Sequence, residues 1–248
     1  MEKKFGLIGQ SVGHSFSKNF FDEKFFRDGL RDHRYDLYPL KVIDDLKTLL
    51  KENPELYGLN ITIPYKEQVI KFLSEIDETA KTIGAVNVIK IQNEKLTGFN
   101  TDYAAFLETL QRWLPVGTQY KALILGTGGS SKAVKVALNK MSIPFEMVSR
   151  EAGNAEHTYE SLKKNPAVVK KSHLIINTTP LGMTPDTESF PPIPYDKLTS
   201  DHFVYDLIYN PARTVFLQKS EMKGAHIKNG LEMLHVQAEK SWEIWSRD

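Results

Sequence analysis

Apolar residues recur along this chain at two spacings, one typical of strands and one typical of helices. Residues 59–63 alternate strictly between apolar and polar side chains, and residues 4–8 form a short apolar run that ends at Gly9. Both patterns predict strands. Further strands are expected at 86–91, 96–99, 122–125, 145–148, 174–177 and 202–206, the first two joined by a turn at Asn93-Glu94.

Helical patterns separate these runs. Four phenylalanines between 16 and 25 share one helical face, and an apolar pattern at 42–50 ends at Asn53-Pro54. A third helix is expected to begin at Asn100 or Thr101, and the last helix carries its apolar stripe over 231–245. From residue 122 onward strands and helices alternate, which predicts a parallel sheet covered by helices on both faces. We therefore predict an α/β protein.

Composition narrows the class of protein. The chain has 248 residues, 41% of them hydrophobic and 25% charged, with a net charge of +1. This balance gives no reason to expect nucleic acid or membrane as a partner, and no apolar stretch approaches the ~20 residues of a membrane span. The chain has no cysteine, which excludes disulfides, thiolate metal sites and cysteine nucleophiles. We expect a cytoplasmic protein with a small-molecule partner.

A glycine-rich turn follows the predicted strand at 122–125. Gly126-x-Gly128-Gly129 leads directly into a helical pattern, with Ser131 where a third glycine is usual. Strand, glycine turn and helix suit a dinucleotide, because the backbone can approach the pyrophosphate and the helix N-terminus attracts it. The alternative is an ordinary strand-to-helix loop. A P-loop does not fit, since Lys132 lacks the preceding glycine and the following Ser or Thr.

Arg150 ends the next predicted strand, 24 residues after Gly126. At this position an arginine accommodates the 2′-phosphate of NADP, whereas an acidic residue binds the ribose of NAD. A guanidinium contacts phosphate through paired hydrogen bonds, but the adjacent Glu151 would repel it. The alternative is an exposed arginine at a strand end.

Polar residues of the first half form a second candidate site. Ser15 and Ser17 precede the first predicted helix, where Ser17 is expected to be the N-cap, although two such hydroxyls also suit a carboxylate ligand. Lys66 and Asp102 each follow the end of a predicted strand, where α/β sites usually form. Singly, each is most simply a surface charge. His14 has no second histidine at metal-ligand spacing, so no metal site is predicted.

Taken together these residues resemble the shikimate dehydrogenase family over nearly the whole chain. The matching strings are Gly9-x-x-x-x-His14-Ser15-x-Ser17, Asn60-x-Thr62-x-Pro64-x-Lys66, Gly84-Ala85-Val86-Asn87, Asn100-Thr101-Asp102, Leu125-Gly126-x-Gly128-Gly129, Asn177-Thr178-Thr179-Pro180-Leu181-Gly182-Met183, Tyr205-Asp206-x-x-Tyr209-Asn210-Pro211 and Asn229-Gly230-Leu231-x-Met233-Leu234-x-x-Gln237-Ala238. Departures include Phe99 in place of an acidic residue, and Ser149-Arg150-Glu151 in place of Asn-Arg-Thr.

The resemblance implies reversible reduction of 3-dehydroshikimate to shikimate with NADPH, a step of aromatic amino acid (chorismate) biosynthesis. It implies a substrate domain at 1–101 completed by a helix at 230–248, a Rossmann-type NADP-binding domain at 102–229, and an active-site cleft between them. By analogy Lys66 and Asp102 are catalytic, and the substrate residues are Ser15, Ser17, Asn60, Thr62, Asn87, Tyr209 and Gln237. The cofactor residues are Gly126, Thr127, Gly128, Gly129, Ser149, Arg150, Thr178, Thr179, Gly230 and Met233.

Three alternatives remain open at this point. A quinate/shikimate dehydrogenase would accept a further ring hydroxyl and could prefer NAD. A catalytically silent dinucleotide-binding module would need neither Lys66 nor Asp102. A bifunctional folate dehydrogenase has a similar plan, but Ser15, Ser17 and Gln237 weigh against it. The chain is expected to be a monomer or a homodimer.

The groups themselves suggest a mechanism. Hydride delivery to a ketone builds negative charge on its oxygen, and Lys66 can donate a proton there and take it back in the oxidation. Asp102 would favour the ammonium form of the lysine if the two side chains approach each other. The hypothesis is therefore a coupled lysine–aspartate pair.

Overall fold

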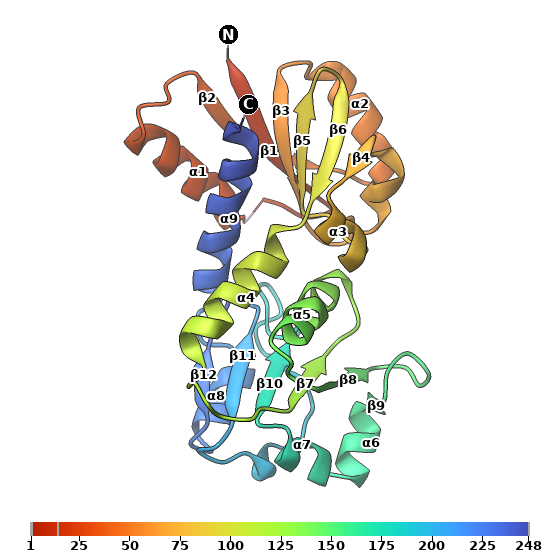
Figure 1. Ribbon diagram of the computed structural model, residues 1–248, viewed down its shortest axis with the longest axis vertical. Helices are drawn as coiled ribbons and strands as arrows, with labels where there is room; N and C mark the ends of the chain where they lie inside the picture. The colour runs from red at the N-terminus through yellow and green to blue at the C-terminus, as the bar shows by residue number, and fades with distance from the viewer. Residues whose placement is uncertain (1, 14, 248) are drawn as a thin grey trace. The chain divides into compact units, whose positions relative to one another are not determined.

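The computed structural model describes residues 2–13 and 15–247, which fall into two compact units (Figure 1). The first unit comprises the chain up to Asp102 and again from His235, and the second runs from Tyr103 to Leu234. The chain leaves the first unit inside one helix and returns to it inside another, α4 (Thr101–Trp113) and α9 (Leu231–Ser246). The expected domain boundary at 101/102 lies one residue before the observed boundary at 102/103. The expected boundary at 229/230 lies five residues before the observed one at 234/235.

The first unit is built on a six-stranded mixed sheet in the order β2-β1-β3-β5-β6-β4. Its strands are β1 (Lys3–Gly9), β2 (His33–Pro39), β3 (Leu56–Ile61), β4 (Glu75–Ile76), β5 (Val88–Gln92) and β6 (Lys95–Phe99). β1 pairs in parallel with β2 and β3, whereas β5 is antiparallel to both β3 and β6. The β5–β6 hairpin turns at Asn93 and Glu94, which both have positive φ, as the predicted turn requires.

Helices cover both faces of this sheet. Successive strand residues point to opposite faces, so Leu7 packs in a cluster with α1 (Phe16–Arg27) and α9, while Ile8 packs in another with α2 (Leu46–Glu52). The second cluster also takes residues from η2 (Gln68–Phe72) and α3 (Glu78–Ile83), and η1 (Ile43–Asp45) precedes α2. Because β1 and β3 pair in parallel, their carboxyl ends lie beside each other at one edge of the sheet.

The second unit is built on a parallel six-stranded sheet in the order β12-β11-β10-β7-β8-β9. Its strands are β7 (Ala122–Leu125), β8 (Phe145–Ser149), β9 (His157–Thr158), β10 (Leu174–Asn177), β11 (Phe203–Asp206) and β12 (His226–Lys228). All residues of β7 and β10 are buried, which explains their continuous apolar runs. Strand order reverses between β7 and β10. In such a Rossmann-type sheet ligands bind beyond the carboxyl ends of the strands at this point.

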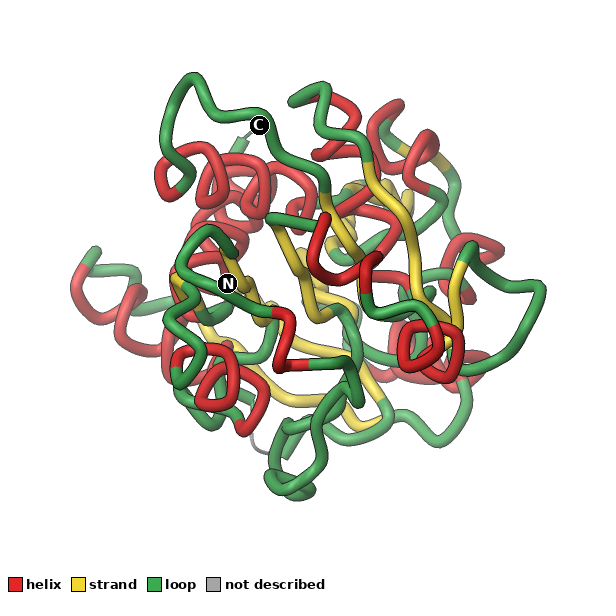
Figure 2. Tube along the Cα trace, turned by 90° about the horizontal axis from the view of Figure 1, so that it is seen from below, coloured by secondary structure: helices red, strands yellow, loops and turns green. Residues whose placement is uncertain are grey.

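Helices also flank the sheet of the second unit. α6 (Tyr159–Lys164), α7 (Ala167–Lys171) and α8 (Val215–Glu221) contribute to the apolar cluster on one face, and η3 (Tyr195–Lys197) lies at its margin. α4 packs on the other face, where Phe106 contacts the ring of Tyr205 and Thr109 hydrogen-bonds its hydroxyl at 2.8 Å. Figure 2 shows strands between helices. The predicted α/β class with a Rossmann-type unit is confirmed.

Some expectations about single elements were wrong. The strand predicted at 59–63 begins at Leu56 and ends at Ile61, so Ile63 lies beyond it and is 55% exposed. The reason is that the chain turns here, with Tyr65 N–H donating to Thr62 O at 3.0 Å, and Pro64 cannot donate a ladder hydrogen bond. Within the described part of the chain, no helix has the length and apolar character needed to cross a membrane.

Candidate active site

Lys66 and Asp102 form an ion pair in the first unit. The distance from Lys66 Nζ to Asp102 Oδ2 is 2.6 Å, and their side chains are only 14% and 10% exposed. Lys66 lies in the turn after β3, where its carbonyl accepts a hydrogen bond from Val86 N–H at 2.8 Å. Asp102 lies in the first turn of α4, where the helix dipole favours a carboxylate. The structure therefore brings together the two residues that the sequence singled out as catalytic candidates.

Asn87 holds the second oxygen of this carboxylate. Its Nδ2 donates to Asp102 Oδ1 at 2.9 Å and to Thr101 Oγ1 at 3.0 Å, and its Oδ1 accepts from Thr101 N–H at 2.7 Å. A backbone N–H can only donate, so this contact fixes which end of the amide faces Asp102. Both carboxylate oxygens are thus engaged by donors. Thr101 was not predicted as a site residue, because its contribution depends on a partner fourteen positions away.

Asn60 and Thr62 lie two positions apart at the end of β3. Asn60 was expected on a polar face, but it is 4% exposed because α9 covers that face and its amide donates to Ser241 Oγ at 3.0 Å. Thr62 is half-buried just beyond the strand, with its N–H bonded to Ile8 O at 2.9 Å. A side chain on Gly9 would come within 2.4 Å of Thr62 Cγ2, which explains the glycine at the end of β1.

The two serines lie at the start of α1, and one expectation about them was wrong. Ser15, not Ser17, is the N-cap: its backbone is extended, and its hydroxyl accepts from Ser17 N–H at 3.2 Å. Ser15 has the extended backbone of an N-cap, so the first helical residue is Phe16. Ser17 is buried and Ser15 half-buried. His14 lies outside the described residues.

The remaining predicted substrate residues are distributed over both units. Gln237 belongs to the first unit, half-buried on α9, and its carbonyl accepts from Ser241 Oγ at 2.8 Å. Tyr209 belongs to the second unit, half-buried in the loop after β11. All of the other predicted substrate and catalytic residues belong to the first unit.

The glycine turn after β7 has the geometry of a phosphate cradle. Gly126 has a φ of 106°, and a Cβ there would lie 2.8 Å from both Thr178 Oγ1 and Thr179 Cγ2. A Cβ on Gly128 would meet nothing within 4 Å. α5 (Gly129–Lys140) starts here with Gly128 as its N-cap. Ser131 N–H donates to Gly128 O at 3.0 Å, whereas no side chain caps the helix start, which suits an anionic ligand.

The departure from the usual third glycine also has a structural explanation. Ser131 is 1% exposed, and its hydroxyl donates to Gly128 O at 2.7 Å. It therefore braces the turn from inside rather than facing a ligand. The residues of the turn fit a pyrophosphate, and exposed Thr127 lies between the closely packed Gly126 and the open Gly128.

A buried carboxylate holds the loop that packs against Gly126. Asn177 Oδ1 accepts from Thr179 N–H at 3.0 Å and from Thr179 Oγ1 at 2.6 Å, and Thr178 Oγ1 donates to Leu125 O at 2.7 Å. Asn177 Nδ2 in turn donates to Asp206 Oδ1 at 3.0 Å. Burial raises the pKa of Asp206 to about 6, although Thr214 and the N–H of Ile208 also donate to it. Asp206 was not predicted, although an acidic residue ending an apolar strand was a usable signal.

Arg150 and Ser149 lie at the end of β8. Ser149 is 5% exposed and its hydroxyl accepts from Glu151 N–H at 3.1 Å, which shapes the turn. Arg150 is exposed. The carboxylate of Glu151, the residue after Arg150, accepts a hydrogen bond from Asn154 Nδ2 at 3.2 Å. The arginine is placed where the fold puts the 2′-phosphate contact.

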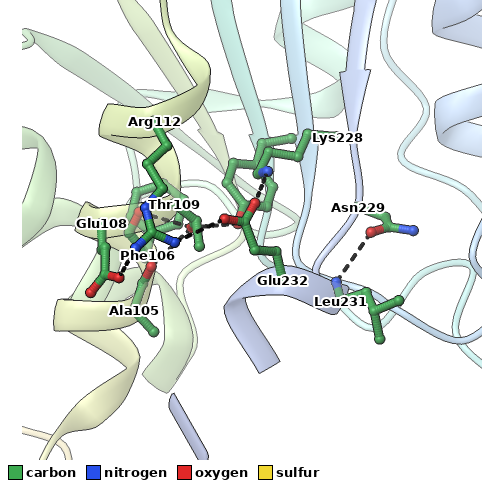
Figure 3. A network of polar contacts seen from close by, with 10 residues as sticks. Ala105, Phe106, Glu108, Thr109, Arg112, Lys228, Asn229, Leu231 and Glu232 are labelled. Carbon is green, nitrogen blue, oxygen red and sulfur yellow. Dashed lines mark hydrogen bonds and ion pairs between the residues drawn. The ribbon is translucent and has the colours of Figure 1, made fainter. Parts of the chain in front are cut away.

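The first turn of α9 is held by a polar network within the second unit (Figure 3). Glu232 pairs with Lys228 and with Arg112 Nη1 at 3.3 Å, which ties it to α4. A Cβ on Gly230 would lie 2.1 Å from Leu207 O, so only glycine fits there. Met233, 7% exposed, follows directly on this turn. The network thus holds in place the segment that carries the cofactor candidates Gly230 and Met233.

Among the described residues, no group of three or more acidic or histidine side chains is arranged to hold a metal ion. The candidate site of the first unit consists of a lysine–aspartate pair with amide and hydroxyl groups beside it. The candidate site of the second unit is a dinucleotide cradle.

Comparison with known proteins identifies the family. Residues 7–89 match the family model described as shikimate dehydrogenase substrate binding domain. Over 98% of its length the chain is 37% identical to the shikimate dehydrogenase (NADP(+)) of Methanococcus maripaludis, and it covers 91% of that protein. The chain belongs to the shikimate dehydrogenase family. The resemblance read from the eight strings is thereby confirmed.

Solved structures of the shikimate dehydrogenase family share the fold. Shikimate 5-dehydrogenase from Thermus thermophilus, in complex with NADP(H) and shikimate, superposes with a TM-score of 0.85 at 28% identity, covering 98% of this chain and 93% of that one. Quinate dehydrogenase from Corynebacterium glutamicum, in complex with NAD, superposes with a TM-score of 0.86 at 26% identity, covering 99% and 94%. The fold alone therefore does not separate the two activities.

Proposed function

We propose that this protein is an NADP-dependent shikimate dehydrogenase that reversibly reduces 3-dehydroshikimate to shikimate. The observation that carries the proposal is the Lys66–Asp102 pair, held at 2.6 Å and braced by Asn87, in a chain 37% identical over 98% of its length to a shikimate dehydrogenase (NADP(+)). A pair of this kind is suited to proton transfer at a carbonyl oxygen.

We assign the substrate to polar groups of the first unit. Ser15 and Ser17 would bind the carboxylate at the start of α1, where hydroxyls and the helix N-terminus both favour an anion. The ring hydroxyls would be bound by Asn60, Thr62, Asn87, Asp102 and Gln237. Tyr209, which belongs to the second unit, is proposed as a substrate residue from the family resemblance alone. A site lined by such groups rejects ligands that leave them unpaired, so it favours a polyol over an apolar ring.

Lys66 carries the proton transfer in this proposal. As the ketone is reduced, negative charge develops on its oxygen, and the ammonium of Lys66 stabilises this charge and donates a proton to it. In the oxidation the neutral amine takes the proton from the hydroxyl. Asp102 orients the Lys66 side chain, and Asn87 keeps the carboxylate in place through Oδ1. Bound NADPH supplies the hydride.

The cofactor is assigned to the second unit. Gly126, Thr127, Gly128 and Gly129 would cradle the pyrophosphate, and Ser149 and Arg150 would bind the 2′-phosphate. Thr178, Thr179, Gly230 and Met233 would line the nicotinamide end. The support is the open cradle at Gly128 and the exposed guanidinium at the end of β8. We also propose that the enzyme works in the cytoplasm, as a monomer or homodimer.

A second candidate is a dehydrogenase that accepts quinate as well, with relaxed cofactor choice. The observation that favours it is the similarity to the quinate dehydrogenase of Corynebacterium glutamicum. A catalytically silent dinucleotide-binding module is less well supported, because it has no need of the buried Lys66–Asp102 pair.

The test is a set of four parallel oxidation assays, with shikimate or quinate as substrate and NADP or NAD as cofactor. We expect the highest kcat/KM for shikimate with NADP. Comparable rates with quinate would support the second candidate. Tight cofactor binding without turnover of either acid would support the silent module.

A further inference from the structure

Tyr35 and Ser241 lie on either side of Asn60 in the core of the first unit. Tyr35 on β2 and Ser241 on α9 are both 0% exposed. The Tyr35 hydroxyl donates to Asn60 Oδ1 at 2.8 Å, and Asn60 Nδ2 donates to Ser241 Oγ at 3.0 Å. The ring of Tyr35 stacks on Phe21 with centroids 4.5 Å apart, which restricts its motion.

The partners of Asn60 leave its amide only one orientation. Nδ2 faces the carbonyl of Asn87 at 3.4 Å, and a carbonyl can only accept. It also faces Ser241 Oγ, whose proton is already donated to Gln237 O at 2.8 Å. Both neighbours on this side are therefore acceptors, and Oδ1 must face the donor Tyr35. Both hydrogens of Nδ2 are used, while Oδ1 keeps one lone pair.

Burial raises the pKa of Tyr35 well above its usual range, which keeps the hydroxyl protonated and able to donate. The chain of contacts therefore reaches two residues assigned above to the substrate, Asn60 on β3 and, through its backbone carbonyl, Gln237 on α9.

We propose that Tyr35 and Ser241 are positioning residues that hold the Asn60 amide so that it accepts, and does not donate, a hydrogen bond from a ring hydroxyl of the substrate. The inference rests on the proposed function. Neither residue touches the reacting atoms. They affect the affinity for the polyol ring and the direction of the hydrogen bond between the ring and Asn60.

Ser241→Ala tests the proposal, with Ser220→Ala as a matched control. Ser220 is also 0% exposed in a helix, and its hydroxyl donates to the carbonyl four residues earlier, Phe216 O, at the same 2.8 Å. The two variants thus differ mainly in the lost contact to Asn60. We expect KM for shikimate to rise on the order of 10-fold in Ser241→Ala, with kcat changed less than about 3-fold. Ser220→Ala should leave KM unchanged.

Tyr35→Phe provides a second variant should Ser241→Ala fold poorly. Its control is Tyr65→Phe, because Tyr65 is 3% exposed in the same unit and donates to Leu40 O at 2.8 Å. Both variants lose one buried hydrogen bond of equal length and should lower Tm similarly. Only Tyr35→Phe should raise KM for shikimate, and NADP affinity measured without substrate should be unchanged in both.

A thermodynamic cycle that combines the protein variants with substrate analogues separates a positioning role from a general loss of stability. Analogues of shikimate that each lack one ring hydroxyl are assayed with the wild-type protein and with the variants. The analogue without the hydroxyl bound by Asn60 should cost the wild type about 10-fold in KM but Ser241→Ala or Tyr35→Phe less than about 3-fold.

If the variants behave like their controls, or if the analogue costs are equal in variant and wild type, the proposal is overturned. Failure of the wild type to oxidise shikimate would instead remove the proposed function.

Discussion

Replacing Asp102 with asparagine should disable the active site without unfolding the protein. The reason lies in its two partners. Lys66 Nζ can only donate, and Asn87 presents Nδ2 to Asp102 because its Oδ1 is held by Thr101 N–H. A carboxylate accepts from both. An asparagine has one acceptor oxygen, so whichever way its amide turns, an NH2 group faces a donor.

The magnitude follows from the loss of a partly buried charge pair. A hydrogen bond to a charged group contributes about 1.5–3 kcal/mol, and Asp102→Asn removes such a contact from the partly buried Lys66 ammonium, the proposed proton donor. At about 1.4 kcal/mol per factor of ten, kcat/KM for shikimate should fall on the order of 10- to 10²-fold. Affinity for NADP should be unchanged, since the cofactor candidates surround the cradle of the second unit.

The assay is steady-state oxidation of shikimate together with NADP titration in the absence of substrate. Asp77→Asn is the matched control, because Asp77 is also a carboxylate at a helix start, where it caps α3 through Thr79 and Ala80 N–H groups. Asparagine is an equally good N-cap. If Asp102→Asn lowers kcat/KM by less than 10-fold, or if Asp77→Asn lowers it as much, the reasoning about the pair is refuted.

Three further outcomes are expected. Lys66→Ala should reduce turnover on the order of 10²- to 10⁴-fold with NADPH affinity kept, and near-wild-type turnover would exclude the lysine as the proton donor. Arg150→Ala should reduce the preference for NADP over NAD about 10- to 100-fold, measured as the ratio of kcat/KM values, since a charge-assisted contact is lost; an unchanged ratio would assign the 2′-phosphate elsewhere. The pKa of Asp206, raised to about 6 by burial, lies above the ~3.9 of an unfolded aspartate. Its contribution to stability is therefore fully present below pH ~4 and lost as pH rises through about 6, by roughly 3 kcal/mol. Denaturant unfolding at pH 4 to 7 should show this loss in the wild type and not in Asp206→Asn, and equal slopes in both would contradict it.

Continuous apolar runs were enough to place the buried strands of the second unit. β7 and β10 are covered by helices on both faces, so residues 122–125 and 174–176 are all apolar, and such runs are visible without a structure. The edge strand β2 was not predicted, because only Tyr35 among its residues is buried and its pattern resembles a loop. The strand predicted at 59–63 extended two residues beyond the end of β3, since Ile63 is apolar but exposed.

Motif spacing was enough to find the glycine turn after a buried strand. Lys66 and Asp102 also follow strand ends, but only the family resemblance assigned them together as catalytic residues. The contacts that orient these groups depended on the fold. Ser241 lies 181 residues from Asn60 and reaches it only because α9 packs over the first sheet. Asn87 and Asp206 likewise act through partners supplied by other elements. Local patterns record which faces are buried, whereas the partner of a buried polar group is chosen by packing between distant segments, and so the candidate residues could be predicted but their orientation could not.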